Sequence, residues 1–105
     1  MSLKSISPQA AADLVAKGAV LVDIREADER ARIRIPGTLP AALSKIATID
    51  LPKDATALIF HCKSGMRTNA NAATLARKTE CEAYVVEGGL DAWVKSGLPH
   101  TADGK

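Results

Sequence analysis

Residues 57–67 read Ala-Leu-Ile-Phe-His-Cys-Lys-Ser-Gly-Met-Arg, an apolar run followed at once by a polar loop that carries a thiol. A short apolar run that ends in a turn is typical of a strand buried on both faces of a parallel sheet. The residues that follow, 69–78, place small and apolar side chains at helical spacing. This stretch therefore predicts a buried strand, a short loop and one helix in succession.

The same alternation of strands and helices runs through the rest of the chain. Further buried strands are expected at 19–24 and 83–86, and helices at 27–32 and 90–95, with a loop at 35–40 and a short helical piece near Leu43. Ser7 and Pro8 give the N-cap and first turn of another helix, which Gly18 ends. We expect an α/β fold with a central parallel sheet covered by helices on both faces, in which ligands bind beyond the carboxyl ends of the strands.

Composition limits the classes of protein that this chain can form. Its 105 residues suit one domain, 1–105. The composition, with 47% hydrophobic and 25% charged residues, excludes the disordered, collagen-like and coiled-coil classes of protein. Aromatic residues make up 3% and the formal net charge is +2, so no nucleic-acid partner is expected.

No apolar run approaches the ~20 residues of a membrane span, and the amino terminus lacks the apolar run of a signal peptide. We therefore expect a soluble, cytoplasmic chain. Cys62 and Cys81 are too few for a disulfide scaffold, so both are expected to be free thiols.

The loop after residue 60 carries the most specific chemistry. Backbone N–H groups of a short loop that leads into a helix can converge on Cys62 and lower its pKa, which makes the thiolate a nucleophile. Lys63 and Arg67 would add positive charge and hold an anionic substrate. We expect Cys62 to be an exposed functional thiol. The alternatives are a small buried hydrophobe for Cys62 and ordinary solvated loop charges for the two cations.

Other polar residues are assigned structural roles. His61 is expected to pack at its strand end, and Cys81 lacks neighbouring cations or glycines. Asp23 can accept hydrogen bonds from loop N–H groups, and Arg25 can pair with a neighbouring carboxylate. The cysteines and histidines lack the spacing of a zinc site, and no glycine-rich nucleotide motif is present, so no metal or cofactor is expected.

Three blocks of the sequence together resemble the single-domain bacterial rhodanese family. Residues 21–29 with Ile-Pro-Gly at 35–37 are similar to its amino-terminal signature, and loop 62–67 has the length of its six-residue active-site loop. Residues 86–93 followed by Gly-Leu-Pro at 97–99 resemble its carboxy-terminal signature. The resemblance implies a rhodanese-like α/β domain with a central parallel sheet of about five strands.

The same resemblance implies sulfur transfer in two steps. The Cys62 thiolate takes the outer sulfur of a donor such as thiosulfate, and a cyanide ion, a thiol or a partner protein then accepts the sulfur from the Cys62 persulfide. The expected structural supports are Asp23, Arg25 and Trp93, the last as a core anchor whose indole N–H finds one acceptor. Gly88 and Gly89 would form a turn that needs positive φ or close backbone approach. The substrate-binding residues implied are Lys63, Ser64, Gly65, Met66, Arg67 and Thr68.

The departures from the family lie in the first block. Arg30 replaces an aromatic residue, Ile33 and Arg34 replace Gly-His, and Thr38 replaces alanine. Members with a C-x-x-G-x-R loop include amino-terminal parts of membrane proteins. The chain is therefore either a free domain or a piece of a membrane-anchored parent, and its oligomeric state is not readable from the sequence.

Three alternative functions stay open at this point. Related phosphatases and arsenate reductases use H-C-x5-R, whereas His61, Cys62 and Arg67 form H-C-x4-R, one residue shorter. The domain could also be a non-catalytic binding module, although such modules usually lack the cysteine. A persulfide relay to a partner protein would use the same loop as a detoxifying enzyme.

Overall fold

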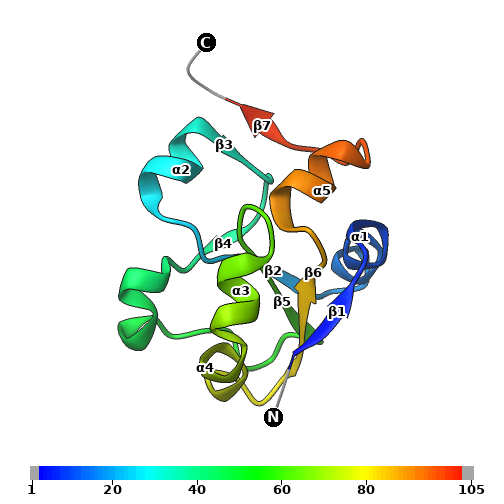
Figure 1. Cartoon of the computed structure of the whole chain (residues 1–105). Helices are drawn as coiled ribbons and strands as arrows, with labels where there is room; N and C mark the ends of the chain where they lie inside the picture. The colour runs from blue at the N-terminus through cyan, green and yellow to red at the C-terminus, as the bar shows by residue number, and fades with distance from the viewer. Residues whose placement is uncertain (1–2, 103–105) are drawn as a thin grey trace.

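The computed structural model describes residues 3–102 and centres on a five-stranded parallel sheet with strand order β1-β6-β5-β2-β4 (Figure 1). Its strands are β1 (Lys4–Ile6), β2 (Val20–Asp23), β4 (Leu39–Pro40), β5 (Ala57–His61) and β6 (Glu82–Val86). The three strands expected from their apolar runs, β2, β5 and β6, form the middle of this sheet. The α/β prediction with a parallel sheet is confirmed.

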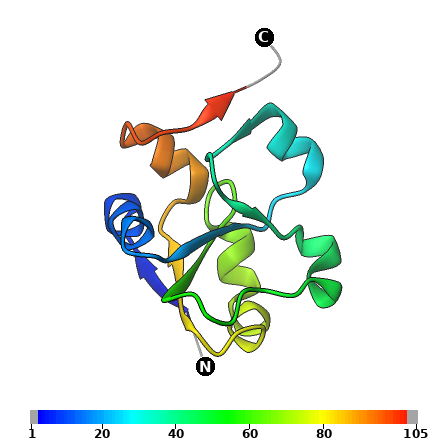
Figure 2. The same cartoon turned by 180° about the vertical axis from the view of Figure 1, so that it is seen from behind.

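Helices lie on both faces of the sheet (Figures 1 and 2). They are α1 (Pro8–Ala16), α2 (Ala27–Arg32), the 3-10 helix η1 (Leu43–Thr48), α3 (Met66–Ala70), α4 (Ala72–Arg77) and α5 (Gly89–Lys95). Helix α1 begins as its sequence predicts, because the Ser7 side chain accepts a hydrogen bond from the Ala10 N–H and Pro8 occupies the first turn.

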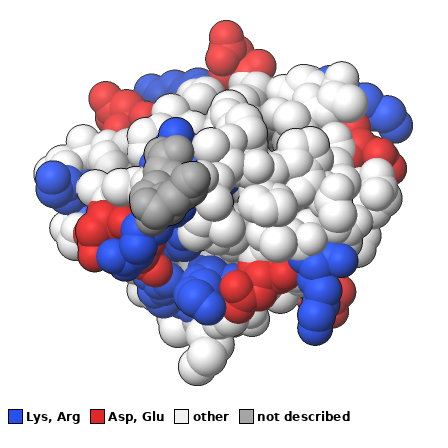
Figure 3. Space-filling model, turned by 90° about the horizontal axis from the view of Figure 1, so that it is seen from above, with Lys and Arg blue, Asp and Glu red and all other residues white. Residues whose placement is uncertain are grey.

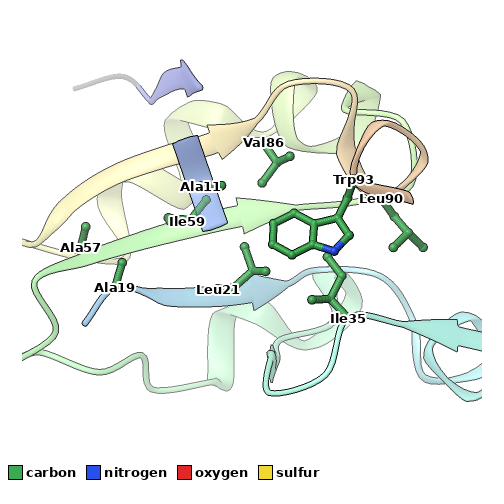
Figure 4. Close-up of a cluster of buried hydrophobic side chains, with 9 residues drawn as sticks. All are labelled: Ala11, Ala19, Leu21, Ile35, Ala57, Ile59, Val86, Leu90 and Trp93. Atoms are coloured by element: carbon green, nitrogen blue, oxygen red, sulfur yellow. The ribbon is translucent and has the colours of Figure 1, made fainter. Parts of the chain in front are cut away.

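One face of the sheet packs against α1 and α5 through an aliphatic core that includes Trp93 (Figure 4). The indole Nε1–H of Trp93 donates to the Pro99 carbonyl at 2.7 Å, so Trp93 is the core anchor that the sequence predicts. The members of this core are Ala11, Ala19, Leu21, Ile35, Ala57, Ile59, Val86, Leu90 and Trp93.

The opposite face packs against η1 and α4 through a second core, to which Ile46 and Leu75 contribute. Phe60 of β5 is fully buried there, and the Cys62 side chain belongs to the same cluster. The candidate nucleophile is thus seated at the end of a strand that both cores hold rigidly.

Parallel register brings the chemically interesting residues to one edge. Asp23 pairs with His61 across β2 and β5, and Phe60 pairs with Val85 across β5 and β6. The strands therefore end together, and the segments that follow them, including loop 62–67, lie at the same edge.

Several short elements differ from the sequence-based predictions. Strand β1 was not expected, and β4 lies inside the segment predicted as a loop. The helix expected at 69–78 is two helices, α3 and α4, which meet at Asn71 with non-helical φ −116° and ψ 19°. A two-stranded antiparallel sheet of β3 (Ile33–Arg34) and β7 (Thr101–Ala102) was also missed. Such short strands carry too few residues to show a hydrophobic period.

Candidate active site

The loop that follows β5 encloses the Cys62 sulfur. The Gly65 N–H donates to Cys62 Sγ at 3.1 Å, from a left-handed backbone position with φ 97° that suits glycine. Thr68 Oγ1 lies 3.8 Å from the sulfur and donates to the Gly65 carbonyl at 2.9 Å. The first turn of α3 therefore points polar hydrogens at the thiol.

The Cys62 side chain is only 1% exposed, so the expectation of an exposed thiol is wrong. Its sulfur packs into the core below the loop, because Cys62 belongs to the same hydrophobic cluster as Val22 and Phe60. A ligand therefore has to approach through the loop rather than meet a protruding side chain.

The loop nevertheless favours the thiolate form. Burial by itself raises the pKa of Cys62, but hydrogen bonds from the Thr68 backbone and hydroxyl and from the Gly65 and Arg67 N–H groups outweigh it. The net pKa of the thiol lies below its ordinary value, as the sequence predicts for a loop of converging N–H groups.

Arg67 is held by a residue that the sequence did not single out as part of the site. Its guanidinium makes a bidentate ion pair with Glu29 of α2 at 2.7 and 2.8 Å. This hydrogen bonding lowers the pKa of Glu29 to about 2 and raises the pKa of Arg67. Glu29 is part of the family signature, but nothing in the sequence shows that it contacts a residue 38 positions away.

Lys63 also has an acidic partner. Its ammonium lies 3.3 Å from Asp91 in the first turn of α5, and both side chains are more than half exposed. Such a pair is weak, so Lys63 is available to an anion at little cost. Among the other expected binding residues, Ser64 and Met66 are exposed, and Gly65 and Thr68 are buried.

A glycine turn supports the loop from behind. Gly88 and Gly89 both have positive φ, and Leu90 and Asp91 donate their N–H groups to the carbonyls of Cys62 and Lys63 at 2.8 and 2.9 Å. A Cβ on Gly89 would lie 2.6 Å from the Cys62 carbonyl oxygen, so no larger residue fits. The expected turn with close backbone approach is confirmed.

Asp23 is the centre of a buried polar cluster beneath the site. Its carboxylate accepts from the Arg25 backbone N–H, from the Arg25 side chain and from Arg30 at 3.0 Å. Arg25 also donates to the Ile33 carbonyl, and Arg30 to the Thr38 hydroxyl at 2.7 Å. Two departures from the family signature, at positions 30 and 38, therefore contact each other.

His61 faces the same cluster from the end of β5. It is fully buried, and its Nε2 lies 3.7 Å from an Asp23 oxygen without a hydrogen-bond partner in the described part of the chain. Burial lowers the pKa of His61, which favours a neutral ring at neutral pH. His61 packs at its strand end, as the sequence predicts.

Residues 3–102 contain no group of three or more histidine, cysteine, aspartate or glutamate side chains placed to hold a metal ion. Within the same residues, none of the helices is both long and apolar enough to span a bilayer. Both described cysteines are free thiols.

Comparison with known proteins places this geometry in a family. The family model of the rhodanese-like domain matches residues 7–96. The chain belongs to the rhodanese family. A sulfurtransferase from Allochromatium vinosum is 36% identical over 79% of this chain and 78% of its own length. A thiosulfate sulfurtransferase GlpE from Ectopseudomonas mendocina is 34% identical over 96% of this chain and 94% of its own length.

The fold agrees with this assignment. The crystal structure of a rhodanese-related protein from Thermoplasma volcanium has a TM-score of 0.82 and 22% identity, and the match covers 95% of this chain and 99% of that one. The relatives make this chain a transferase of the rhodanese type.

Proposed function

We propose that this chain moves sulfane sulfur from a small anionic donor such as thiosulfate to a thiophilic acceptor, through a persulfide on Cys62. The names of the relatives support sulfur transfer. The observation that supports the mechanism is the hydrogen bond of 3.1 Å that the Gly65 N–H donates to Cys62 Sγ, together with the lowered pKa of that thiol.

In the first step, the Cys62 thiolate attacks the outer sulfur of thiosulfate. A new S–S bond forms on Cys62, the S–S bond of the donor breaks, and sulfite leaves with the electron pair of that bond. The N–H groups at the start of α3 then face the outer sulfur of the persulfide, where they stabilise its negative charge.

Arg67 and Lys63 supply the positive charge that brings the anionic donor to the loop. Arg67 is 37% exposed and Lys63 is 64% exposed, so both can contact an anion while their carboxylate partners remain nearby. In the second step, the acceptor attacks the outer sulfur of the persulfide and Cys62 leaves as a thiolate, ready for another donor.

Intact mass spectrometry tests the proposal directly. Incubation with thiosulfate should add about 32 Da to the protein, and cyanide should then remove this mass with formation of thiocyanate. The Cys62→Ser variant should show neither change, whereas Cys81→Ser should behave like the wild type. Absence of the adduct, or Cys62-dependent hydrolysis of a phosphate ester in its place, would overturn the proposal.

A further inference from the structure

The His61 ring lies between two oxygen atoms that only accept hydrogen bonds. Its Nδ1 is 3.2 Å from the Cys62 carbonyl oxygen, and its Nε2 is 3.7 Å from Oδ2 of the Asp23 carboxylate. His61 and Asp23 are both fully buried. Because a neutral imidazole has one N–H and one bare nitrogen, the ring can donate to only one of these two oxygens.

The oxygens of Asp23 are already occupied by two arginines. Oδ1 accepts from the backbone N–H and the Nε of Arg25, and Oδ2 accepts from the side chains of Arg25 at 2.9 Å and Arg30 at 3.0 Å. The separation of 3.7 Å between His61 Nε2 and Oδ2 is too long for a further hydrogen bond. The Cys62 carbonyl is therefore the better acceptor for the single proton of the ring.

The surroundings of the ring also keep it neutral. Burial lowers the pKa of His61, and the positive charges of Arg25 and Arg30 add to this effect, while Asp23 and the Cys62 carbonyl oppose it. Arg30 stands where the family signature has an aromatic residue. This chain therefore places one more cation beside the ring than the signature supplies.

The carbonyl that faces Nδ1 belongs to the first peptide group of the thiol loop. It also accepts the Leu90 N–H of α5 at 2.8 Å, so β5 and α5 each offer it one donor. A trans peptide group is planar, and its N–H points opposite to its C=O. Two donors on the Cys62 carbonyl therefore fix the direction of the Lys63 N–H and the path of the chain toward Gly65, whose N–H reaches the sulfur.

We infer that His61 is a positioning residue for sulfur transfer: its Nδ1–H donates to the Cys62 carbonyl and holds the first peptide group of the thiol loop in place. The inference rests on the proposed function and adds a residue to it. Arg25 and Arg30 fix the tautomer, because they occupy the Asp23 carboxylate that would otherwise attract the proton to Nε2. His61 acts through the loop backbone and exchanges no proton with the substrate.

Nitrogen NMR tests the tautomer in the intact wild-type protein. With isotope-labelled histidine at neutral pH, Nδ1 of His61 should have the chemical shift of an N–H, and Nε2 that of a bare nitrogen. The chain has two histidines, and the spectrum of His61→Asn identifies which signals belong to His61. An N–H at Nε2 in place of Nδ1, or an N–H at both, would overturn the inference.

Substitutions at position 61 test the role in sulfur transfer. The amide nitrogen of asparagine can occupy the place of Nδ1, that of glutamine the place of Nε2, and leucine has no donor. Each variant is mixed with thiosulfate, and the gain of about 32 Da is followed by mass spectrometry. His100→Leu is the matched control, because the exposed His100 ring also contacts a carbonyl, that of Leu98 at 3.1 Å.

We expect the rate constant for loading to fall about tenfold in His61→Leu and in His61→Gln, which corresponds to the loss of one hydrogen bond. His61→Asn should recover most of this loss and stay within about threefold of the wild type. His100→Leu should load at the wild-type rate. The pH midpoint of Cys62 alkylation by iodoacetamide should be higher in His61→Leu than in His61→Asn.

A wild-type loading rate in His61→Leu, or equal falls in His61→Leu and His61→Asn, would overturn the positioning role and leave the proposed function intact. Failure of the wild type to load with thiosulfate would instead overturn the proposed function, and the positioning role with it. The NMR measurement needs no variant at position 61 that is active, so it decides the tautomer even if the leucine variant does not fold.

Discussion

At Cys62, two opposing effects act on one sulfur atom. Packing in the second core raises the energy of a charge there, and the hydrogen bonds from the first turn of α3 lower it. The thiol can be both a core residue and a nucleophile because the hydrogen bonds outweigh the burial. The alternatives that the sequence left open, a buried side chain or a reactive one, are therefore not exclusive.

The Thr68 hydroxyl gives a way to test this balance. The Thr68 hydroxyl lies 3.8 Å from the sulfur and can turn from the Gly65 carbonyl to donate to the thiolate; Thr68→Val removes it, so the pKa of Cys62 should rise. Only the thiolate reacts with iodoacetamide, and the thiolate fraction grows as pH rises through the pKa. The midpoint of the alkylation rate against pH should therefore move to higher pH in this variant.

Thr68→Ser keeps the hydroxyl and serves as the control for Thr68→Val. Its alkylation midpoint should stay close to that of the wild type. If Thr68→Val and the wild type share one midpoint, the backbone N–H groups alone set the pKa of Cys62.

At the scale of elements, the start of α5 determines the position of the thiol loop. The turn at Gly88 and Gly89 brings the α5 amides onto the carbonyls of Cys62 and Lys63. The loop is therefore held on one side by its own helix, α3, and on the other by a helix that follows the next strand of the sheet.

Gly89→Ala should damage both stability and the loop. A Cβ there would lie 2.6 Å from the Cys62 carbonyl oxygen and 2.7 Å from that of Lys63, in addition to the strain of φ +60°. We expect a loss of about 3 kcal/mol or more in the free energy of unfolding, measured by urea denaturation, and slower loading of Cys62 by thiosulfate.

Gly97→Ala separates the cost of backbone strain at positive φ from the cost of steric contact with the loop carbonyls. Gly97 has φ +79°, but a Cβ added there would meet nothing within 4 Å, so only the backbone strain remains. Its cost should be about 1 kcal/mol, with loading of Cys62 at the wild-type rate. Equal costs for the two variants would show that contact with the loop carbonyls is unimportant.

The sequence predicts those elements whose stability is local or strongly patterned. The apolar runs of β2, β5 and β6 and the Ser7-Pro8 start of α1 all appear where expected. The short strands β1 and β4 were missed, because their place in the sheet depends on pairing with β6 and β2 rather than on their own residues. The break at Asn71 was missed because small residues on both sides of it suit a helix.

In the site, too, features set by neighbouring residues were predicted and contacts between distant residues were missed. Cys62 and its loop were predicted from adjacent residues, and the glycine turn from its composition. The partners of the two loop cations were not, because Glu29 and Asp91 reach them from 38 and 28 residues away. The depth of Cys62 was also misjudged, since a strand-to-helix loop does not reveal which way its first side chain points.

At the scale of the whole molecule, two kinds of interaction hold the chain together. The sheet and the helices on its faces are joined by two apolar cores. Helix α2, at the edge above the site, has no buried residue and is joined to the rest by polar contacts. These are Arg30 with Asp23 and Thr38, Glu29 with Arg67, and Glu26 with the Ser44 hydroxyl at 2.6 Å.

Charges of both signs are interspersed around the rim of the face seen from above, and its centre is uncharged (Figure 3). This agrees with a formal net charge of only +2. Individual ion pairs, rather than a field of one sign, therefore determine the electrostatics of this face.

Glu29→Gln tests how far such a pair contributes to stability. The pair with Arg67 lowers the pKa of Glu29 to about 2, from about 4.3 for a glutamate in an unfolded chain. A lowered pKa means that the stabilisation is complete above the unfolded value and is lost as pH falls toward the folded value. At pH 7 we expect Glu29→Gln to lower the free energy of unfolding by about 1–2 kcal/mol. Urea denaturation of both proteins from pH 7 to pH 3 should show this difference shrinking below about pH 4.5. A difference that stays constant over this range would mean that the charge of Glu29 contributes nothing, and that α2 is held in place by its other contacts.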